Sequence, residues 1–85
     1  MPPMNGDRSA RIEIILGENI RAARELRGLT REQVAARIGV PVIHLARVEA
    51  GLALPSVIMF VRVAKALDVD ADFLLGYSEQ GGPRS

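Results

Sequence analysis

Apolar residues recur at helical spacing in five segments of the chain, which are separated by short stretches rich in Gly, Pro and Asp. In the first segment, at about residues 11–27, Ile12, Leu16 and Ile20 lie four positions apart, with charged residues between them. This spacing places apolar side chains on one face of a helix, whereas strict alternation would indicate a strand. Gly28 is suited to end the helix, because glycine adopts the left-handed backbone conformation at little cost.

Four further helices are expected, at residues 30–38, 41–50, 56–67 and 70–75. Thr30 and Gln33 have the spacing of a capping box, in which the Thr hydroxyl and the Gln side chain each bind the other residue's backbone N–H. Pro41 suits a first helical position because its φ is fixed near the helical value, and Ser56 is a favoured N-cap. Only two residues, beginning with Gly39, join the second and third helices. Such a tight turn is typical of a helix-turn-helix.

These segments predict an all-α fold, in which five helices form one compact domain over residues 11–77. A chain of 85 residues can bury one modest core. Aromatic residues make up only 4% of the chain, so the core must be aliphatic, which favours packed helices over a sheet. Residues 1–10, which include turn-forming Pro, Asn and Gly, are expected to be a flexible N-terminal arm. Residues 78–85 are expected to be a flexible C-terminal tail for the same reason.

Composition excludes several functional classes. The chain has no cysteine, and its one histidine, His44, lacks partners at metal-ligand spacing, so we expect no metal, no cofactor and no enzymatic activity. The glycines Gly17, Gly28, Gly39 and Gly51 are interpreted as punctuation of the helices rather than as a phosphate-binding loop. No apolar run approaches the ~18 residues of a membrane span, and no secretory signal begins the chain. A cytoplasmic protein without membrane contact is therefore expected.

The charge distribution favours a nucleic-acid partner only weakly. The formal net charge is +1. The first fifty residues carry eight Arg against six acidic residues, whereas the remainder carries more acidic than basic residues. A nucleic acid would therefore meet the first half of the chain. Nearly all the basic residues are Arg, whose planar fork suits phosphate and guanine but suits protein carboxylates equally well.

Small and apolar residues occur in a fixed order along the chain: Leu16, Gly17, Ile20, Arg21, Arg24, Gly28, Leu29, Thr30, Val34, Ala35, Ile38, Gly39, Val40, Leu45, Val48, Glu49, Gly51, Pro55, Ser56, Ala64, Ala66, Leu67, Phe73, Leu74 and Leu75. In this order and spacing, residues 16–76 resemble the Cro/C1-type helix-turn-helix family, also called the XRE family. The resemblance implies a lambda-repressor-like domain of five helices. It also implies a sequence-specific DNA-binding transcriptional repressor that acts as a homodimer on a two-fold-related operator.

The resemblance also implies roles for individual residues. A recognition helix at about 41–50 would enter the major groove of double-stranded DNA. The DNA-binding residues would be Thr30, Arg31, Val42, Ile43, His44, Ala46, Arg47 and Ser56. Of these, Arg47 is the best base reader and Arg31 the best phosphate contact. Arg24 and Glu49 would form an ion pair between the first and third helices. The dimer contact would involve Phe73, Leu74 and Tyr77, although Phe73 and Leu74 suit a core equally well.

The expected reading surface departs from the family pattern. Family members usually carry polar residues at the base-reading positions, whereas this chain has Val42, Ile43 and Ala46, followed by the apolar loop 52–54. A contiguous apolar surface is typical of protein contacts. The alternative hypothesis is therefore a helix-turn-helix domain that binds a protein partner or self-assembles through the third helix. That surface would consist of Val42, Ile43, Ala46, Leu52, Leu54 and Met59.

Overall fold

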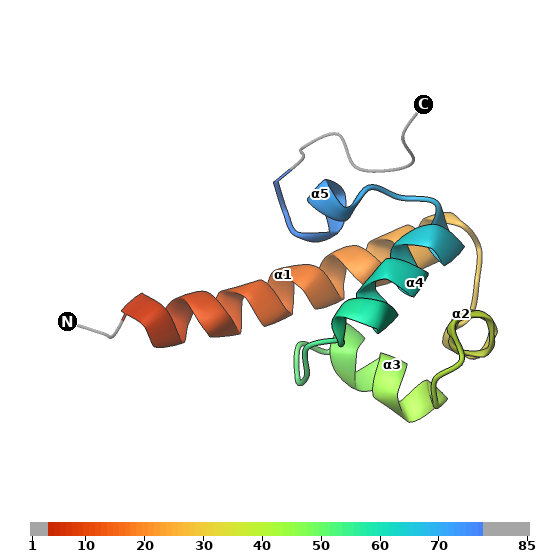
Figure 1. Ribbon diagram of the computed structural model, residues 1–85, viewed down its shortest axis with the longest axis horizontal. Coiled ribbons are helices and arrows are strands. Elements are labelled where there is room, and N and C mark those ends of the chain that lie inside the picture. Colours follow the sequence, from red (N-terminus) through yellow and green to blue (C-terminus); the bar gives the residue numbers. More distant parts are fainter. Residues whose placement is uncertain (1–3, 78–85) are drawn as a thin grey trace.

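A computed structural model describes the backbone of residues 4–77 and the side chains of residues 12–77. It contains five helices and, within residues 4–77, no strand (Figure 1). They are α1 (Met4–Leu26), α2 (Arg31–Ile38), α3 (Val42–Glu49), α4 (Val57–Leu67) and α5 (Ala71–Leu74). The all-α fold with a central helix-turn-helix, formed by α2 and α3, is confirmed.

The first helix is longer than the sequence pattern predicts. It begins at Met4 rather than at about Arg11, so residues 4–10, which we expected in a flexible arm, continue the helix. Figure 1 shows this red end of α1 extending beyond the other helices. Once the rest of α1 is fixed by packing, each added residue extends an existing helix, which costs less than nucleating a new one. The expected tail at residues 78–85 lies outside the described residues.

Local capping defines the short helices. Thr30 caps α2, because its hydroxyl accepts a hydrogen bond from the Gln33 backbone N–H at 3.1 Å while the Gln33 side chain accepts from the Thr30 N–H at 2.8 Å. Gly39 ends α2 with a φ of 74°, a conformation in which glycine carries no Cβ penalty. Pro41, which we expected to be the first helical residue of α3, is instead its N-cap, so the helix begins one position later, at Val42. Gly39 and Pro41 together produce the sharp turn between α2 and α3.

The core is aliphatic and lies between α1, α2, α3 and α4. Its largest fully buried side chains are Ile20, Val34, Ile38, Leu45, Val48, Val63, Leu67 and Leu74. The third helix packs against α1 and α2, and α5 packs against α1 and α4. Two side-chain hydrogen bonds also connect helix ends. Arg62 of α4 donates to the Ile38 carbonyl at 3.2 Å, and Arg27 donates to the Leu67 carbonyl at 2.8 Å. The helix-turn-helix is thereby held on a rigid support.

Candidate nucleic-acid interface

The third helix is buried on one side and exposed on the other. Leu45 and Val48 are fully buried, and they fix the rotation of α3 about its axis. Val42 and Ile43 are 40% and 63% exposed, and Arg47 one turn later is also exposed. The sequence-predicted reading residues His44 and Ala46 are half-buried beside them. The outward face of α3 is therefore apolar at its start and cationic one turn later.

A charged network holds the far end of α3. The Glu49 carboxylate accepts hydrogen bonds from Arg24 Nε at 2.7 Å and from Arg24 Nη2 at 3.0 Å. Both side chains are buried, at 1% exposure for Glu49 and 8% for Arg24. The hydrogen bonds that Arg24 donates to Glu49 raise the pKa of Arg24 above its ordinary value, so the guanidinium stays charged despite its burial. Arg24 thus ties α1 to the last residue of α3.

Arg31, at the start of α2, joins the same network. Its Nε donates to Glu49 Oε1 at 3.0 Å, and its side chain is 41% exposed. The sequence indicated a phosphate contact at this position but not a bond to Glu49, because the two residues lie eighteen positions apart. The structure therefore connects the start of α2 directly with the end of α3.

The two hydroxyl residues predicted to hold phosphates both act as helix caps. Thr30 caps α2, and Ser56 caps α4 by accepting a hydrogen bond from the Met59 backbone N–H at 3.1 Å. Both residues are exposed. A hydroxyl that accepts through its oxygen still has a hydrogen to donate. The geometry therefore leaves Thr30 and Ser56 able to donate to an anion at the start of each helix.

The exposed apolar surface around α3 differs in membership from our expectation. Met59 is only 3% exposed and belongs to the core, so its assignment to this surface was wrong. The reason is its place on α4, where Met59, Val63 and Leu67 lie four positions apart on the buried face. The exposed apolar surface runs from α3 through the loop into α4. Its residues are Val42, Ile43, Leu52, Leu54, Val57, Ile58 and Val61. The same four-residue spacing could have indicated from the sequence that Val57, Ile58 and Val61 face outward.

Comparison with known proteins assigns the family. Residues 20–74 match the family model described as Helix-turn-helix, which covers more than half of the chain. The chain belongs to the Cro/C1-type helix-turn-helix family. It is 40% identical over 60 residues to the uncharacterised HTH-type transcriptional regulator YazB of Bacillus subtilis, covering 71% of this chain and 87% of that protein. The family is one of DNA-binding transcription regulators.

A solved structure supports the same assignment. The crystal structure of the restriction-modification controller protein C.AhdI from Aeromonas hydrophila superimposes with a TM-score of 0.69 at 27% sequence identity. The similarity covers 73% of this chain and 94% of that protein. The chain therefore shares its fold with nearly the whole of that controller protein.

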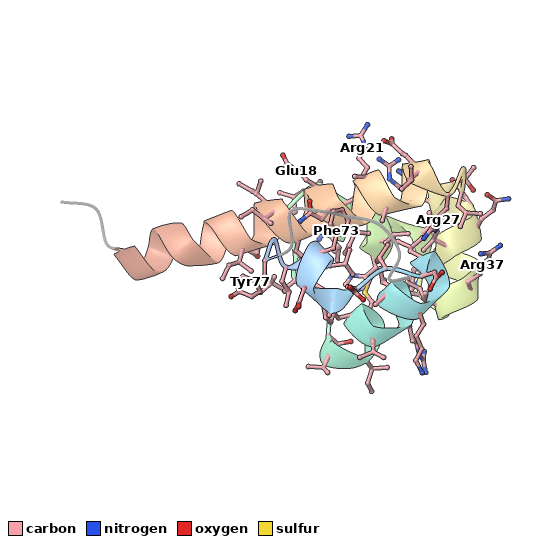
Figure 2. All side chains as sticks on the ribbon, turned by 90° about the horizontal axis from the view of Figure 1, so that it is seen from above. Glu18, Arg21, Arg27, Arg37, Phe73 and Tyr77 are labelled. Carbon is pink, nitrogen blue, oxygen red and sulfur yellow. The ribbon has the colours of Figure 1, made fainter. Side chains whose placement is uncertain are left out.

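A second apolar feature of this helix-turn-helix domain shares Leu54 and Val57 with the exposed apolar surface around α3. A hollow of about 190 Å³ opens between α1, the loop before α4 and the end of α5. Its lining residues are Ile12, Leu16, Leu54, Pro55, Ser56, Val57, Phe60 and Leu75. In Figure 2, Tyr77 lies toward the left of the molecule, Phe73 near its middle, and Arg27 and Arg37 toward the right.

The three residues proposed for the dimer contact have different environments. Leu74 is fully buried in the core, so its assignment to a contact surface was wrong. Leu74 is the buried residue of α5, and this helix packs against α1 and α4. The Leu74 side chain therefore cannot contact a second molecule. Phe73 is half-buried against the core, whereas Tyr77 is 82% exposed. Of the three, Tyr77 is the residue most available to a partner.

The part of the chain that the structure describes contains neither a cluster of metal-ligand side chains nor a membrane-spanning helix. In that part of the chain, no group of three or more His, Cys, Asp or Glu residues is arranged to hold a metal ion. Between residues 4 and 77, no helix is both long enough and apolar enough to cross a membrane.

Proposed function

We propose that this domain is a sequence-specific DNA-binding repressor that reads its operator with α3. The observation that carries the proposal is the outward face of α3, where Arg47 is exposed while Leu45 and Val48 hold the helix rigidly to the core. A helix fixed in this way can enter the major groove and present a constant set of side chains to the base edges. Because its target is DNA, we place the protein in the cytoplasm.

Each exposed residue has a role in this proposal. Arg47 reads guanine, because a guanidinium can donate to both O6 and N7. Val42 and Ile43 contact thymine methyl groups, while Ala46 and His44 line the same edge of the helix. Thr30, Arg31 and Ser56 bind backbone phosphates, which set the position of the protein but carry no sequence information.

We further propose that the repressor is a homodimer that closes over the apolar hollow. Ile12, Leu54 and Val57, which line the hollow, are 49%, 51% and 79% exposed, and Tyr77, two residues after the lining residue Leu75, is 82% exposed. Adjacent exposed apolar side chains favour burial against a second copy. A two-fold contact would then place two α3 helices about one DNA turn apart, roughly 34 Å, over two half-sites.

The test is operator selection from a random duplex library, followed by titration of the selected duplex at two salt concentrations. We expect affinity to fall steeply with salt because phosphate contacts release counterions. Arg47→Ala should lower affinity for the operator more than for a scrambled duplex. Arg21→Ala is the matched control, because Arg21 is an exposed arginine of α1 paired with Glu25. Absence of binding to any duplex at low salt overturns the proposal.

The exposed apolar side chains favour a second candidate function, which is binding of a protein partner or self-assembly through α3. Ile43, Leu52 and Ile58 are each more than 60% exposed, an unusual content for a DNA-reading surface. The double change of Val42→Gln and Ile43→Gln should then abolish self-association measured by light scattering. Leu26→Gln is the control, because Leu26 is 68% exposed on α1. Association that survives the double change rules out this surface.

A further inference from the structure

The Glu49 carboxylate is shared by two arginines that differ in exposure. Arg24 binds both of its oxygens, at 2.7 Å and 3.0 Å, whereas Arg31 binds only Oε1, at 3.0 Å. The Arg24 side chain is 8% exposed and that of Arg31 41% exposed, while Glu49 itself is at 1%. Glu49 therefore binds one buried arginine, Arg24, and one arginine at the protein surface, Arg31.

Charge balance indicates that Arg31 does more than neutralise Glu49. Arg24 alone compensates the single negative charge and gives it two hydrogen bonds, which is the arrangement a buried carboxylate requires. The two arginines and Glu49 together carry one net positive charge, which the partly exposed Arg31 presents at the surface. Glu25 and Glu32 also act electrostatically on Arg24. Its hydrogen bond uses the Nε edge, and a guanidinium has four more N–H donors on its terminal nitrogens. Those donors can bind an anion without release of Glu49.

The position of Arg31 connects two parts of the proposed interface. It is the first residue of α2, next to the N-cap Thr30, and a helix N-terminus carries partial positive charge. Glu49 is the last residue of α3. The Arg31 side chain therefore connects the start of α2, where a phosphate would bind, with the end of α3, which would read the bases.

We propose that Arg31 is a specificity-determining positioning residue, which holds Glu49 with one edge of its guanidinium and a DNA phosphate with the other. A phosphate bound at the start of α2 then fixes the position of α3 against the base edges. The inference rests on the proposed DNA-binding function. It distinguishes Arg31 from an ordinary phosphate contact, which would raise affinity for all duplexes equally.

Arg31→Lys separates these roles. Lysine keeps the charge, but its single ammonium lacks the planar fork that spans two acceptors. We expect affinity for a scrambled duplex, and its salt dependence, to stay within about twofold of the original protein. Affinity for the selected operator should fall by roughly tenfold, the lower end of what one bidentate base contact contributes. The ratio of the two affinities is the diagnostic quantity.

Arg31→Met and a matched pair of controls complete the experiment. Arg31→Met should lower the slope of log affinity against log salt by about one, because one phosphate contact is lost. The fold should survive, since Arg24 still pairs with Glu49, and a thermal melt checks this. Arg37→Lys and Arg37→Met are the controls, because Arg37 is an exposed arginine of the same helix with no ion pair among the described residues. They should leave the affinity ratio unchanged.

The outcomes separate this inference from the proposed function. If the unaltered protein binds no duplex, the proposed function and the inference both fail. If it binds its operator and Arg31→Lys retains the full affinity ratio, only the inference fails and Arg31 is a plain phosphate contact. If Arg31→Met leaves the salt slope unchanged, Arg31 contacts no phosphate and the inference is likewise overturned.

Discussion

Gly17 of α1 lies directly against the backbone of Val48 near the end of α3. A Cβ atom at Gly17 would collide with the Val48 carbonyl oxygen and would lie 2.7 Å from that of Glu49. Glycine inside a helix ordinarily destabilises it by about 1 kcal/mol relative to alanine. Gly17 therefore does not mark a helix boundary but lies where the backbones of α1 and α3 are in close contact.

Gly17→Ala should destabilise the domain by about 1–3 kcal/mol, because the added methyl group must push α3 away from α1. The matched control is Ala22→Gly, at an exposed position in the same helix, which should lose about 1 kcal/mol through helix propensity alone. Urea denaturation of both variants measures the difference. If Gly17→Ala is instead more stable than the original protein, Gly17 does not lie in close contact with the backbone of α3.

Glu49→Gln should cost about 3–5 kcal/mol of folding stability, because it leaves the buried guanidinium of Arg24 without its counter-charge. The comparison is Glu25→Gln, which breaks the Arg21–Glu25 pair between side chains that are 57% and 55% exposed. An exposed pair of this kind contributes about 0.3–0.5 kcal/mol. Equal losses in the two variants, measured by thermal or chemical unfolding, would contradict a buried network at α3.

The features that the sequence revealed are local. The capping box of Thr30 and Gln33 involves residues three positions apart, and Gly39 turns the chain within its own backbone. Interactions of this range leave a signature in a short stretch of sequence. The order of five helices and the helix-turn-helix could therefore be predicted without coordinates.

The features that the sequence did not reveal depend on tertiary packing. The bond from Arg31 to Glu49 joins residues from two helices, and its presence depends on how α3 is tilted. The long α1 was missed because residues 4–10 have poor helix propensity, which extension of an existing helix overrides. Leu74 was left open between a dimer contact and the core because the direction of a four-residue helix cannot be deduced from so few positions.

Thr30→Ala should destabilise the domain by about 1 kcal/mol, because it removes the hydroxyl that caps α2. Thr30→Ser is the conservative control, since serine retains the hydroxyl acceptor and should restore most of the loss. The measurement is the unfolding midpoint without DNA, so that any phosphate contact by Thr30 does not contribute. A loss shared equally by the alanine and serine variants would show that the methyl group, rather than the cap, stabilises α2.

The apolar hollow yields the most direct test of the oligomeric state. Val57 lines the hollow and is 79% exposed in a single chain, so Val57→Asp should leave the fold of the chain intact. In a dimer that closes over the hollow, the same change would bury an unpaired carboxylate, which costs several kcal/mol. We therefore expect Val57→Asp to halve the molar mass measured by sedimentation equilibrium.

The control for this test is Leu26→Asp, because Leu26 is 68% exposed on α1 and does not line the hollow. It should leave the molar mass unchanged. Loss of the dimer should also weaken operator binding, since one recognition helix then contacts only one half-site. If Val57→Asp stays dimeric, a different surface holds the two copies together. If the unaltered chain is itself a monomer at all concentrations, the two-fold operator is no longer expected.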